Sequence, residues 1–303
     1  MDFLYVLEKL RVPILNEFML GVTYLGDEIA FLVVAMILFW CVDKRIGYYV
    51  LSVGFLGTIT NQFMKLWFRI PRPWVLDENF TILEQAREAA TGYSFPSGHT
   101  QSSVGTFGSI AYTTKNKLIR GLCIAAAILV PFSRMYLGVH TPLDVLVAAL
   151  MAVILAIVLR PIVFSKKRWV FPVFLGIMVA VSVGFLCFVE LYRFPTDIDP
   201  HNMQSGLKNA YTLIGSLLGL VLVYIVDEKW LHFSTNAIWW AQILKVTLGL
   251  GLALAIKNGL KAPLEILCGQ FIGRAVRYFL IVVVAGVLWP ITFRWFSRLG
   301  SKE

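Results

Sequence analysis

The sequence contains 303 residues, of which 58% are hydrophobic and 15% are charged. Soluble domains usually carry about 25% charged residues, so this composition excludes an ordinary soluble domain and indicates an integral membrane protein. The formal net charge is +9, but the Lys and Arg residues flank apolar runs and form no basic stripe with interleaved aromatics. We therefore expect them to contact lipid headgroups, and we predict no nucleic-acid partner.

Apolar runs recur along the whole chain. Residues 1–18 predict an amphipathic helix that lies in the membrane interface. Nine longer runs follow, and we expect about nine transmembrane helices, with eight or ten as alternatives. The first run is short and would recruit part of 14–25. The runs lie at 27–42, 47–64, 98–114, 119–136, 142–162, 169–190, 207–226, 237–259 and 271–296. The predicted fold is an all-α, polytopic membrane helix bundle.

Basic residues form dense clusters in the short connections on one side of this predicted bundle. The other side has about as many, but several of those fall in longer loops or in the polar stretches described below. The dense clusters are Lys44 and Arg45; Lys115, Lys117 and Arg120; Arg160, Lys166, Lys167 and Arg168; and Arg294, Arg298 and Lys302. Cytoplasmic loops carry an excess of Lys and Arg, so we expect this side to face the cytoplasm. The long segment 65–97 and the turn at 137–141 then lie at the external face.

Three polar stretches interrupt the apolar pattern, and all of them fall at the external ends of predicted spans. They are "KLWFRIPRP" with Lys65, Arg72 and Pro73; "PSGH" from Pro96 to His99; and "SRMYLGVHTPLD" with Ser133, Arg134, His140 and Asp144. The predicted topology places these ends of the second to fifth spans at one membrane face. The three stretches can therefore converge on one site.

The cations in these stretches indicate an anionic ligand. Lys65, Arg72 and Arg134 are positive charges that would repel one another if they converged without an anion. Arg offers a planar fork of donors and Lys a point charge, and together they suit a phosphoryl group. Ser97 is a candidate N-cap, and Gly98 leaves backbone N–H groups open at a helix start, where the dipole also favours an anion.

Two histidines and an aspartate add reactive groups. Thr141, Pro142 and Asp144 are typical of a helix start, as N-cap, first helical residue and third helical residue. Asp144 would accept a proton from one ring nitrogen of His140, which leaves the other nitrogen as a nucleophile. His99 would protonate the leaving oxygen and later activate water. This set predicts phosphoryl transfer through a phosphohistidine, with no metal or other cofactor, because the cations neutralise charge.

Together the three stretches resemble the signature of the type 2 phosphatidic-acid phosphatase superfamily, K-x6-RP, PSGH and SR-x5-H-x3-D. Every position of the signature is matched, spacing included, and the resemblance covers roughly residues 20–160. It implies a six-helix core with its site at the external or luminal membrane face. It also implies metal-independent hydrolysis of phosphate monoesters or pyrophosphates, often on lipids. The implied roles are nucleophile for His140, its partner for Asp144, acid and base for His99, and phosphate binding for Lys65, Arg72, Ser97, Gly98 and Arg134.

The chain is longer than such a core requires. We expect a phosphatase core at 1–163, which contains all three stretches, and additional membrane helices at 164–303, the first of which would complete the core. Runs rich in Gly and Ala at 217–224 and 245–255 allow close helix packing, either within the chain or with a second copy of it in a homo-oligomer.

The predicted function is a membrane lipid phosphatase that acts on a lipid phosphate monoester or diphosphate. We expect it in the cytoplasmic membrane of a bacterium, with the active site facing outward. One alternative is a phosphatase for a soluble phosphate ester such as a sugar phosphate. Another is a non-catalytic lipid transporter or binding protein. Binding alone needs only the cations, so the presence of His140, Asp144 and His99 favours an enzyme.

Overall fold

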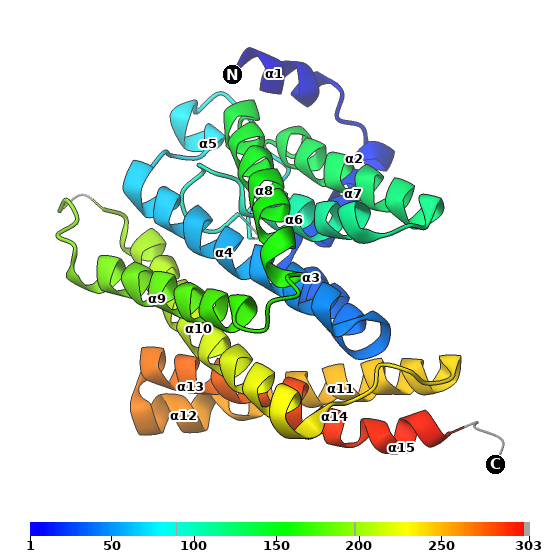
Figure 1. The fold of residues 1–303 in the computed structure, drawn as a ribbon. Coiled ribbons are helices and arrows are strands. Elements are labelled where there is room, and N and C mark those ends of the chain that lie inside the picture. Colours follow the sequence, from blue (N-terminus) through cyan, green and yellow to red (C-terminus); the bar gives the residue numbers. More distant parts are fainter. Residues whose placement is uncertain (89, 197, 300–303) are drawn as a thin grey trace. The chain divides into compact units, whose positions relative to one another are not determined.

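The computed structural model describes residues 1–88, 90–196 and 198–299, and over these residues the chain is helical, without a strand (Figure 1). The α-helices are α1 (Asp2–Lys9), α2 (Pro13–Thr23), α3 (Glu28–Ile37), α4 (Lys44–Phe68), α5 (Pro73–Leu76), α6 (Gly98–Thr113), α7 (Lys117–Tyr136), α8 (Pro142–Val163), α9 (Val170–Leu191), α10 (Pro200–Val226), α11 (Trp239–Gly259), α12 (Lys261–Cys268), α13 (Gln270–Val283), α14 (Trp289–Ile291) and α15 (Phe293–Arg298). The predicted all-α class is confirmed.

Short turns of other helical types join several of these helices. Two are 3-10 turns, η1 (Tyr24–Gly26) and η3 (Glu84–Ala86). Three are π-helical, η2 (Leu38–Val42), η4 (Asp227–Leu231) and η5 (Val284–Leu288). Because π-helical turns are rare and occur mostly as local irregularities in longer helices, η2 and η5 read as continuations of α3 and α13.

The chain divides into two compact units. Unit 1 comprises Met1–Val34, Tyr49–Pro161 and Phe194–Gly206. Unit 2 comprises Ala35–Tyr48, Ile162–Arg193 and Leu207–Glu303. All three polar stretches lie in unit 1. The predicted division of the chain at residues 163 and 164 stays a prediction.

Two helices of unit 1 begin at the caps that the sequence predicts. The Ser97 hydroxyl, at the start of α6, accepts hydrogen bonds from the Thr100 backbone N–H at 3.4 Å and the Thr100 hydroxyl at 3.0 Å. At α8, the Thr141 N–H donates to Asp144 Oδ2 at 2.7 Å, and the Asp144 N–H donates to Thr141 Oγ1 at 3.3 Å. This reciprocal pair fixes both the start of α8 and the direction of the Asp144 carboxylate.

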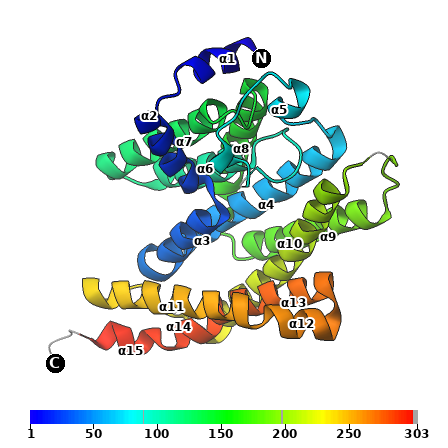
Figure 2. The ribbon, with the colours of Figure 1, turned by 180° about the vertical axis from the view of Figure 1, so that it is seen from behind.

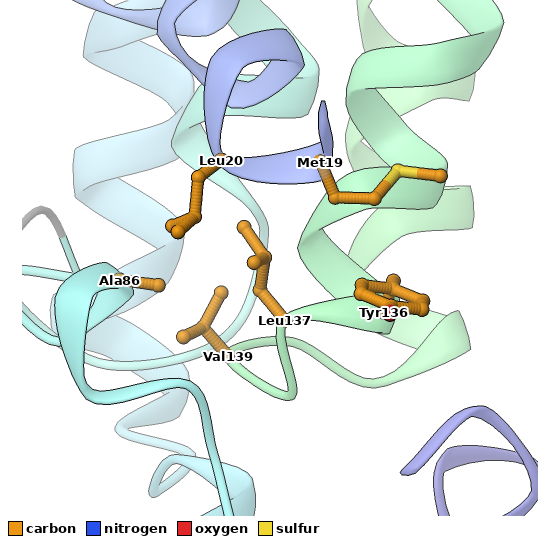
Figure 3. Packing of buried hydrophobic residues seen from close by; sticks show 6 residues of the cluster. All are labelled: Met19, Leu20, Ala86, Tyr136, Leu137 and Val139. Atoms are coloured by element: carbon orange, nitrogen blue, oxygen red, sulfur yellow. The ribbon is translucent and has the colours of Figure 1, made fainter. Parts of the chain in front are cut away.

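A hydrophobic cluster in unit 1 fixes the connection between α7 and α8 (Figure 3). Side chains of α2 pack there against residues from the end of α7, the α7–α8 turn and η3. The cluster consists of Met19, Leu20, Ala86, Tyr136, Leu137 and Val139. The Tyr136 hydroxyl donates to Asn16 Oδ1 of α2 at 2.7 Å. These contacts hold the short segment that separates two of the predicted site residues, Arg134 and His140.

In unit 2, α12 and α13 lie side by side in both views (Figures 1 and 2). Gly273 makes this approach possible, since a Cβ there would lie 2.5 Å from a backbone oxygen of α12. In the predicted small-residue runs, Gly219 packs against Val282 and Gly249 against Trp289. These two glycines therefore serve close helix packing within the chain.

Long apolar helices confirm that the chain is a membrane helix bundle. Among the described residues, six helices are long and apolar enough to cross a membrane, or seven if the pair Pro13–Gly26 and Glu28–Val42, bent by 56°, forms one broken span. Helices occupy most of each of the nine predicted ranges, but α4 is less apolar and α6 has only 16 residues. A helix of about 20 residues is needed to cross the hydrocarbon core, so the count of nine spans stays a prediction.

Candidate active site

The predicted site residues lie at helix ends of unit 1, from the last turn of α4 to the first turn of α8. In chain order they are Lys65, Arg72, Ser97, Gly98, His99, Arg134, His140 and Asp144. Six of these side chains are at most 6% exposed, namely Lys65, Arg72, Ser97, Arg134, His140 and Asp144. Buried charges need partners, so the partner of each group indicates what the cluster can do.

His140 and Asp144 face each other across one helical turn. The distance from His140 Nδ1 to Asp144 Oδ2 is 3.5 Å, which is long for a hydrogen bond. Ser94 contacts both, because its hydroxyl donates to Asp144 Oδ2 at 2.6 Å and lies 3.5 Å from His140 Nδ1. The carboxylate is thus held by Ser94 and by the Thr141 N–H, on the Nδ1 side of the imidazole ring.

Arg72 determines which ring nitrogen of His140 carries the proton. Its Nη1 lies 2.9 Å from His140 Nε2 and also donates to the Val139 carbonyl at 3.0 Å. The remaining donors reach the carbonyls of Gly92 at 3.1 Å and Thr91 at 2.7 Å. A guanidinium only donates, so Nε2 is the acceptor. In the neutral ring the proton therefore lies on Nδ1, facing Asp144, and Nε2 keeps its lone pair.

Arg134 is fully buried, yet most of its donors are unused. Nη1 donates to the Thr23 hydroxyl at 2.8 Å, whereas Nε and Nη2 have no hydrogen-bond partner among the described residues. Lys65 is 4% exposed, and its ammonium donates to the Tyr93 carbonyl. The large majority of buried N–H donors in folded proteins have a hydrogen-bond acceptor. The unused donors of Arg134 therefore indicate a binding site for an anion beside its guanidinium.

His99 has a partner that the sequence reasoning did not identify. Its Nε2 lies 2.7 Å from Oδ1 of Asp27, the residue before α3. Gly26 allows this contact, because a Cβ there would lie 2.9 Å from the His99 Cβ. Asp27 stabilises the protonated form of His99, but burial and the charge of Arg134 outweigh this contact and lower the pKa of His99 to about 4. A bound phosphoryl group would offset the charge of Arg134 and favour protonation of His99.

The cationic side chains act together on His140. Burial lowers the pKa of His140 well below its ordinary value, and the charges of Arg72, Arg134, Lys65 and His99 lower it further, in decreasing order. The ring is therefore neutral at neutral pH, as a nucleophile must be. Burial also lowers the pKa of Arg72, to about 10, against the charge of Asp144, which raises it. Arg72 thus remains charged at neutral pH.

The structure brings all eight predicted residues to one region of unit 1 and adds neighbours. Asp27, Ser94 and Thr23 were missed. Ser94 lies two residues before the predicted "PSGH", so its polarity was a usable signal, whereas no local pattern marks Asp27 or Thr23. Within the described ranges no group of three His, Cys, Asp or Glu side chains is arranged to hold a metal ion.

Comparison with known proteins extends the resemblance to most of the chain. Residues 45–168 match the PAP2 superfamily, and residues 211–302 match the transmembrane extension of PAP2 superfamily phosphatases. Phosphatidylglycerophosphatase B of Bacillus subtilis is 31% identical over 150 residues, which are 45% of this chain and 70% of that protein. The chain belongs to the PAP2 superfamily. The first match contains all eight predicted site residues of this PAP2 protein.

Two further relatives of the PAP2 protein differ in how much they share with it. Undecaprenyl-diphosphatase BcrC of Bacillus subtilis is 33% identical over 102 residues, 34% of this chain and 50% of its own length. Sphingosine-1-phosphate phosphatase 1 of Mus musculus is 28% identical over 278 residues, 83% of this chain and 60% of its own length. The chain therefore spans only half to about two thirds of the length of several relatives. No solved structure matches it.

Proposed function

We propose that this PAP2 protein is an integral membrane phosphatase that hydrolyses a lipid phosphate monoester or diphosphate. The observation that carries the proposal is Arg134, a fully buried guanidinium with two nitrogen atoms that find no hydrogen-bond partner in the described part of the chain. An unpaired buried charge is destabilising unless a ligand completes it. A phosphoryl group matches the planar fork of donors, and Lys65 and Arg72 add charge around the same imidazole ring.

In the first chemical step, His140 Nε2 attacks the phosphorus atom of the substrate. Its lone pair forms the N–P bond while the bond from phosphorus to the leaving oxygen breaks. His99, which takes up a proton once the phosphoryl charge offsets the charge of Arg134, gives this proton to that oxygen. The positive charge that develops on the His140 ring is stabilised through Nδ1–H by Asp144, and Arg72 moves from Nε2 to an oxygen of the phosphoryl group.

In the second step, His99, now neutral, removes a proton from water. The hydroxide oxygen attacks phosphorus, the N–P bond breaks and its electron pair returns to His140 Nε2. Inorganic phosphate leaves, and His99 is again protonated beside Asp27. Lys65, Arg72 and Arg134 neutralise the phosphoryl charge in both steps, so we propose a metal-independent reaction.

The substrate class rests on the relatives and on the membrane setting. The names of the relatives specify undecaprenyl diphosphate, phosphatidylglycerophosphate and sphingosine-1-phosphate as their substrates. On α8, Leu146, Leu150 and Ile157 are 66%, 57% and 54% exposed, as expected for a helix that contacts lipid. We further propose that the site faces outward from a bacterial cytoplasmic membrane, since the basic connections predict the opposite side as cytoplasmic.

Phosphate release by the purified full chain in detergent, with EDTA present, tests the proposal. The substrates are a polyprenyl diphosphate, phosphatidic acid, sphingosine-1-phosphate and glucose-6-phosphate. We expect release by the wild type and by His232→Ala, which removes an exposed histidine of unit 2, and none by His140→Ala. The ranking of substrates would identify the lipid class.

Three outcomes would count against parts of the proposal. Equal release from glucose-6-phosphate would make the substrate a soluble ester. Full activity of His140→Ala would remove the phosphohistidine step. No release from any substrate, together with tight lipid binding by both proteins, would make the chain a binding protein.

A further inference from the structure

Unit 2 contains a cavity that is strongly basic. The start of α4, the connection between α8 and α9, and the end of α10 with η4 line it. Its charged lining residues are Lys44, Arg45, Lys166, Lys167, Arg168, Asp227 and Glu228. Five of these seven side chains are positive, and they come from two segments more than 100 residues apart in the sequence. The mechanism proposed above uses none of them.

One of the five cations already has a partner. Lys44 Nζ lies 2.6 Å from Asp227 Oδ2 and 4.3 Å from the centre of the Phe233 ring. The other oxygen of Asp227 accepts the Phe233 backbone N–H at 3.2 Å. Among the described residues that line the cavity there is no second ion pair. Arg45 and the three basic residues 166–168 therefore leave an excess of positive charge.

A buried hydroxyl at the same cavity also lacks a partner. Tyr48 lines the cavity and is 5% exposed, and its hydroxyl has no hydrogen-bond partner among the described residues. The ring is held by edge contacts with Phe39 and Tyr224 and by a tilted contact with Phe171, with centroid distances of 5.1, 5.9 and 5.3 Å. Buried polar groups without a partner are rare in native structures. An oxygen atom of a bound ligand would supply the hydrogen-bond partner that the Tyr48 hydroxyl lacks.

We propose that this cavity is a second site for a phosphate-type anion, distinct from the candidate active site. Phosphate oxygens accept both from Arg and Lys side chains and from a hydroxyl. The anion comes either from the phosphodiester headgroup of a membrane lipid or from free inorganic phosphate. Lys44 is the first residue of α4, whereas Lys65 lies in its last turn. The cavity residues thus belong to the end of α4 that the basic connections predict as cytoplasmic.

Basic residues that only anchor membrane spans would attract anions wherever they lie. The test therefore compares two variants that each lose three positive charges, one at the cavity and one away from it. The first variant is Lys166→Gln/Lys167→Gln/Arg168→Gln. The matched control is Lys115→Gln/Lys117→Gln/Arg120→Gln, which changes three exposed residues around the α6–α7 connection, away from the cavity. Both are made in the full-length Arg134→Gln protein, so that the candidate active site contributes little anion binding.

Two arms distinguish the sources of the anion. Native mass spectrometry measures binding of phosphatidylglycerol against phosphatidylcholine, and calorimetry measures binding of inorganic phosphate. We expect at least about a tenfold loss of affinity in the first variant and less than about a twofold loss in the control. This pattern with phosphatidylglycerol identifies a lipid headgroup, and with inorganic phosphate it identifies the free ion. Equal losses in both variants, or no binding in either arm, would overturn the proposal.

Tyr48→Phe provides a second test that leaves all charges in place. It removes only the unpartnered hydroxyl, so we expect the protein to fold with an unchanged or higher melting temperature. The affinity for the bound anion should fall roughly three- to tenfold, as expected for one lost hydrogen bond to a charged group. Unchanged affinity would show that the anion does not occupy the cavity, and would overturn the assignment of the site.

Discussion

Arg134 of unit 1 and Lys245 of unit 2 are both 0% exposed, but the fold satisfies only one of them. The Lys245 ammonium donates to the carbonyls of Trp40 at 2.9 Å and Thr235 at 3.1 Å. It also lies 4.3 Å from the centre of the Phe293 ring. Lys245 is thus surrounded by backbone acceptors and an aromatic face, which complete its environment without a ligand.

Arg134 is in the opposite situation. Within the residues that the structure describes, it makes a single hydrogen bond, to a hydroxyl, and two of its nitrogen atoms have no partner. Burial alone therefore does not mark a functional cation. A buried cation whose donors are all used contributes to the fold, whereas one with unused donors is kept available for an anion at a cost in stability.

Asp144→Asn should have the largest effect. The amide cannot stabilise the positive ring of His140 and can hold it in the wrong tautomer, so we expect kcat to fall by about 10³- to 10⁴-fold. The measurement is phosphate release at saturating substrate. Asp77→Asn is the control, since Asp77 bonds Tyr5 and lies outside the cluster. A near-normal rate in Asp144→Asn would mean that this carboxylate only caps α8.

Arg134→Gln should lower kcat/KM by about 10²- to 10³-fold, the loss typical of one preorganised donor to a developing charge. Because the substitution also removes an unpaired buried charge, the melting temperature should stay the same or rise. Activity and thermal unfolding are measured on the same preparation. A variant that loses stability together with activity would show that Arg134 is a structural cation like Lys245.

Asp27→Asn tests the partner of His99 and should lower kcat by about tenfold. Without the carboxylate the protonated form of His99 is less stable, so the alkaline limb of the pH–rate profile should move to lower pH. Glu28→Gln removes the neighbouring, exposed carboxylate and serves as control. If the two profiles coincide with that of the wild type, Asp27 has no part in positioning or charging His99.

Lys245→Gln should have the smallest effect on turnover, within about threefold of the wild type. The protein should instead unfold more easily, by about 1 kcal/mol, because hydrogen bonds inside membrane proteins contribute about 0.6 kcal/mol each and two are affected. Thermal unfolding in detergent checks this value. A large loss of turnover at unchanged stability would break the comparison, since it would place Lys245 among the functional cations.

Local sequence patterns could predict much of the site. The spacing of Thr141, Pro142 and Asp144 fixes a capped helix start, and this start places Asp144 one turn after His140. Helix ends at one membrane face then bring the separate stretches together. Asp27 could not be predicted this way, because its contact with His99 depends on how the chain at η1 packs onto α6, 72 residues further on.

The sequence also could not predict that Arg134 lacks partners among the described residues, or that a basic cavity forms at Lys44. Both depend on which side chains meet in three dimensions, and a charge pattern gives only their sign. Apolar length alone also does not fix the number of membrane spans. The chain at 98–113 is helical as expected, but it has 16 residues and many hydroxyl groups, so its apolar length does not decide whether it crosses the membrane.

The central claim is that His140 receives the phosphoryl group within this cluster of cations. The most direct test is a rapid acid-free quench of the full chain during turnover of a substrate labelled with ³²P in the phosphoryl group, followed by location of the label. We expect a base-stable, acid-labile label on His140 that is absent from His140→Gln. A label on another residue, or phosphate release at full rate by His140→Gln, would contradict it.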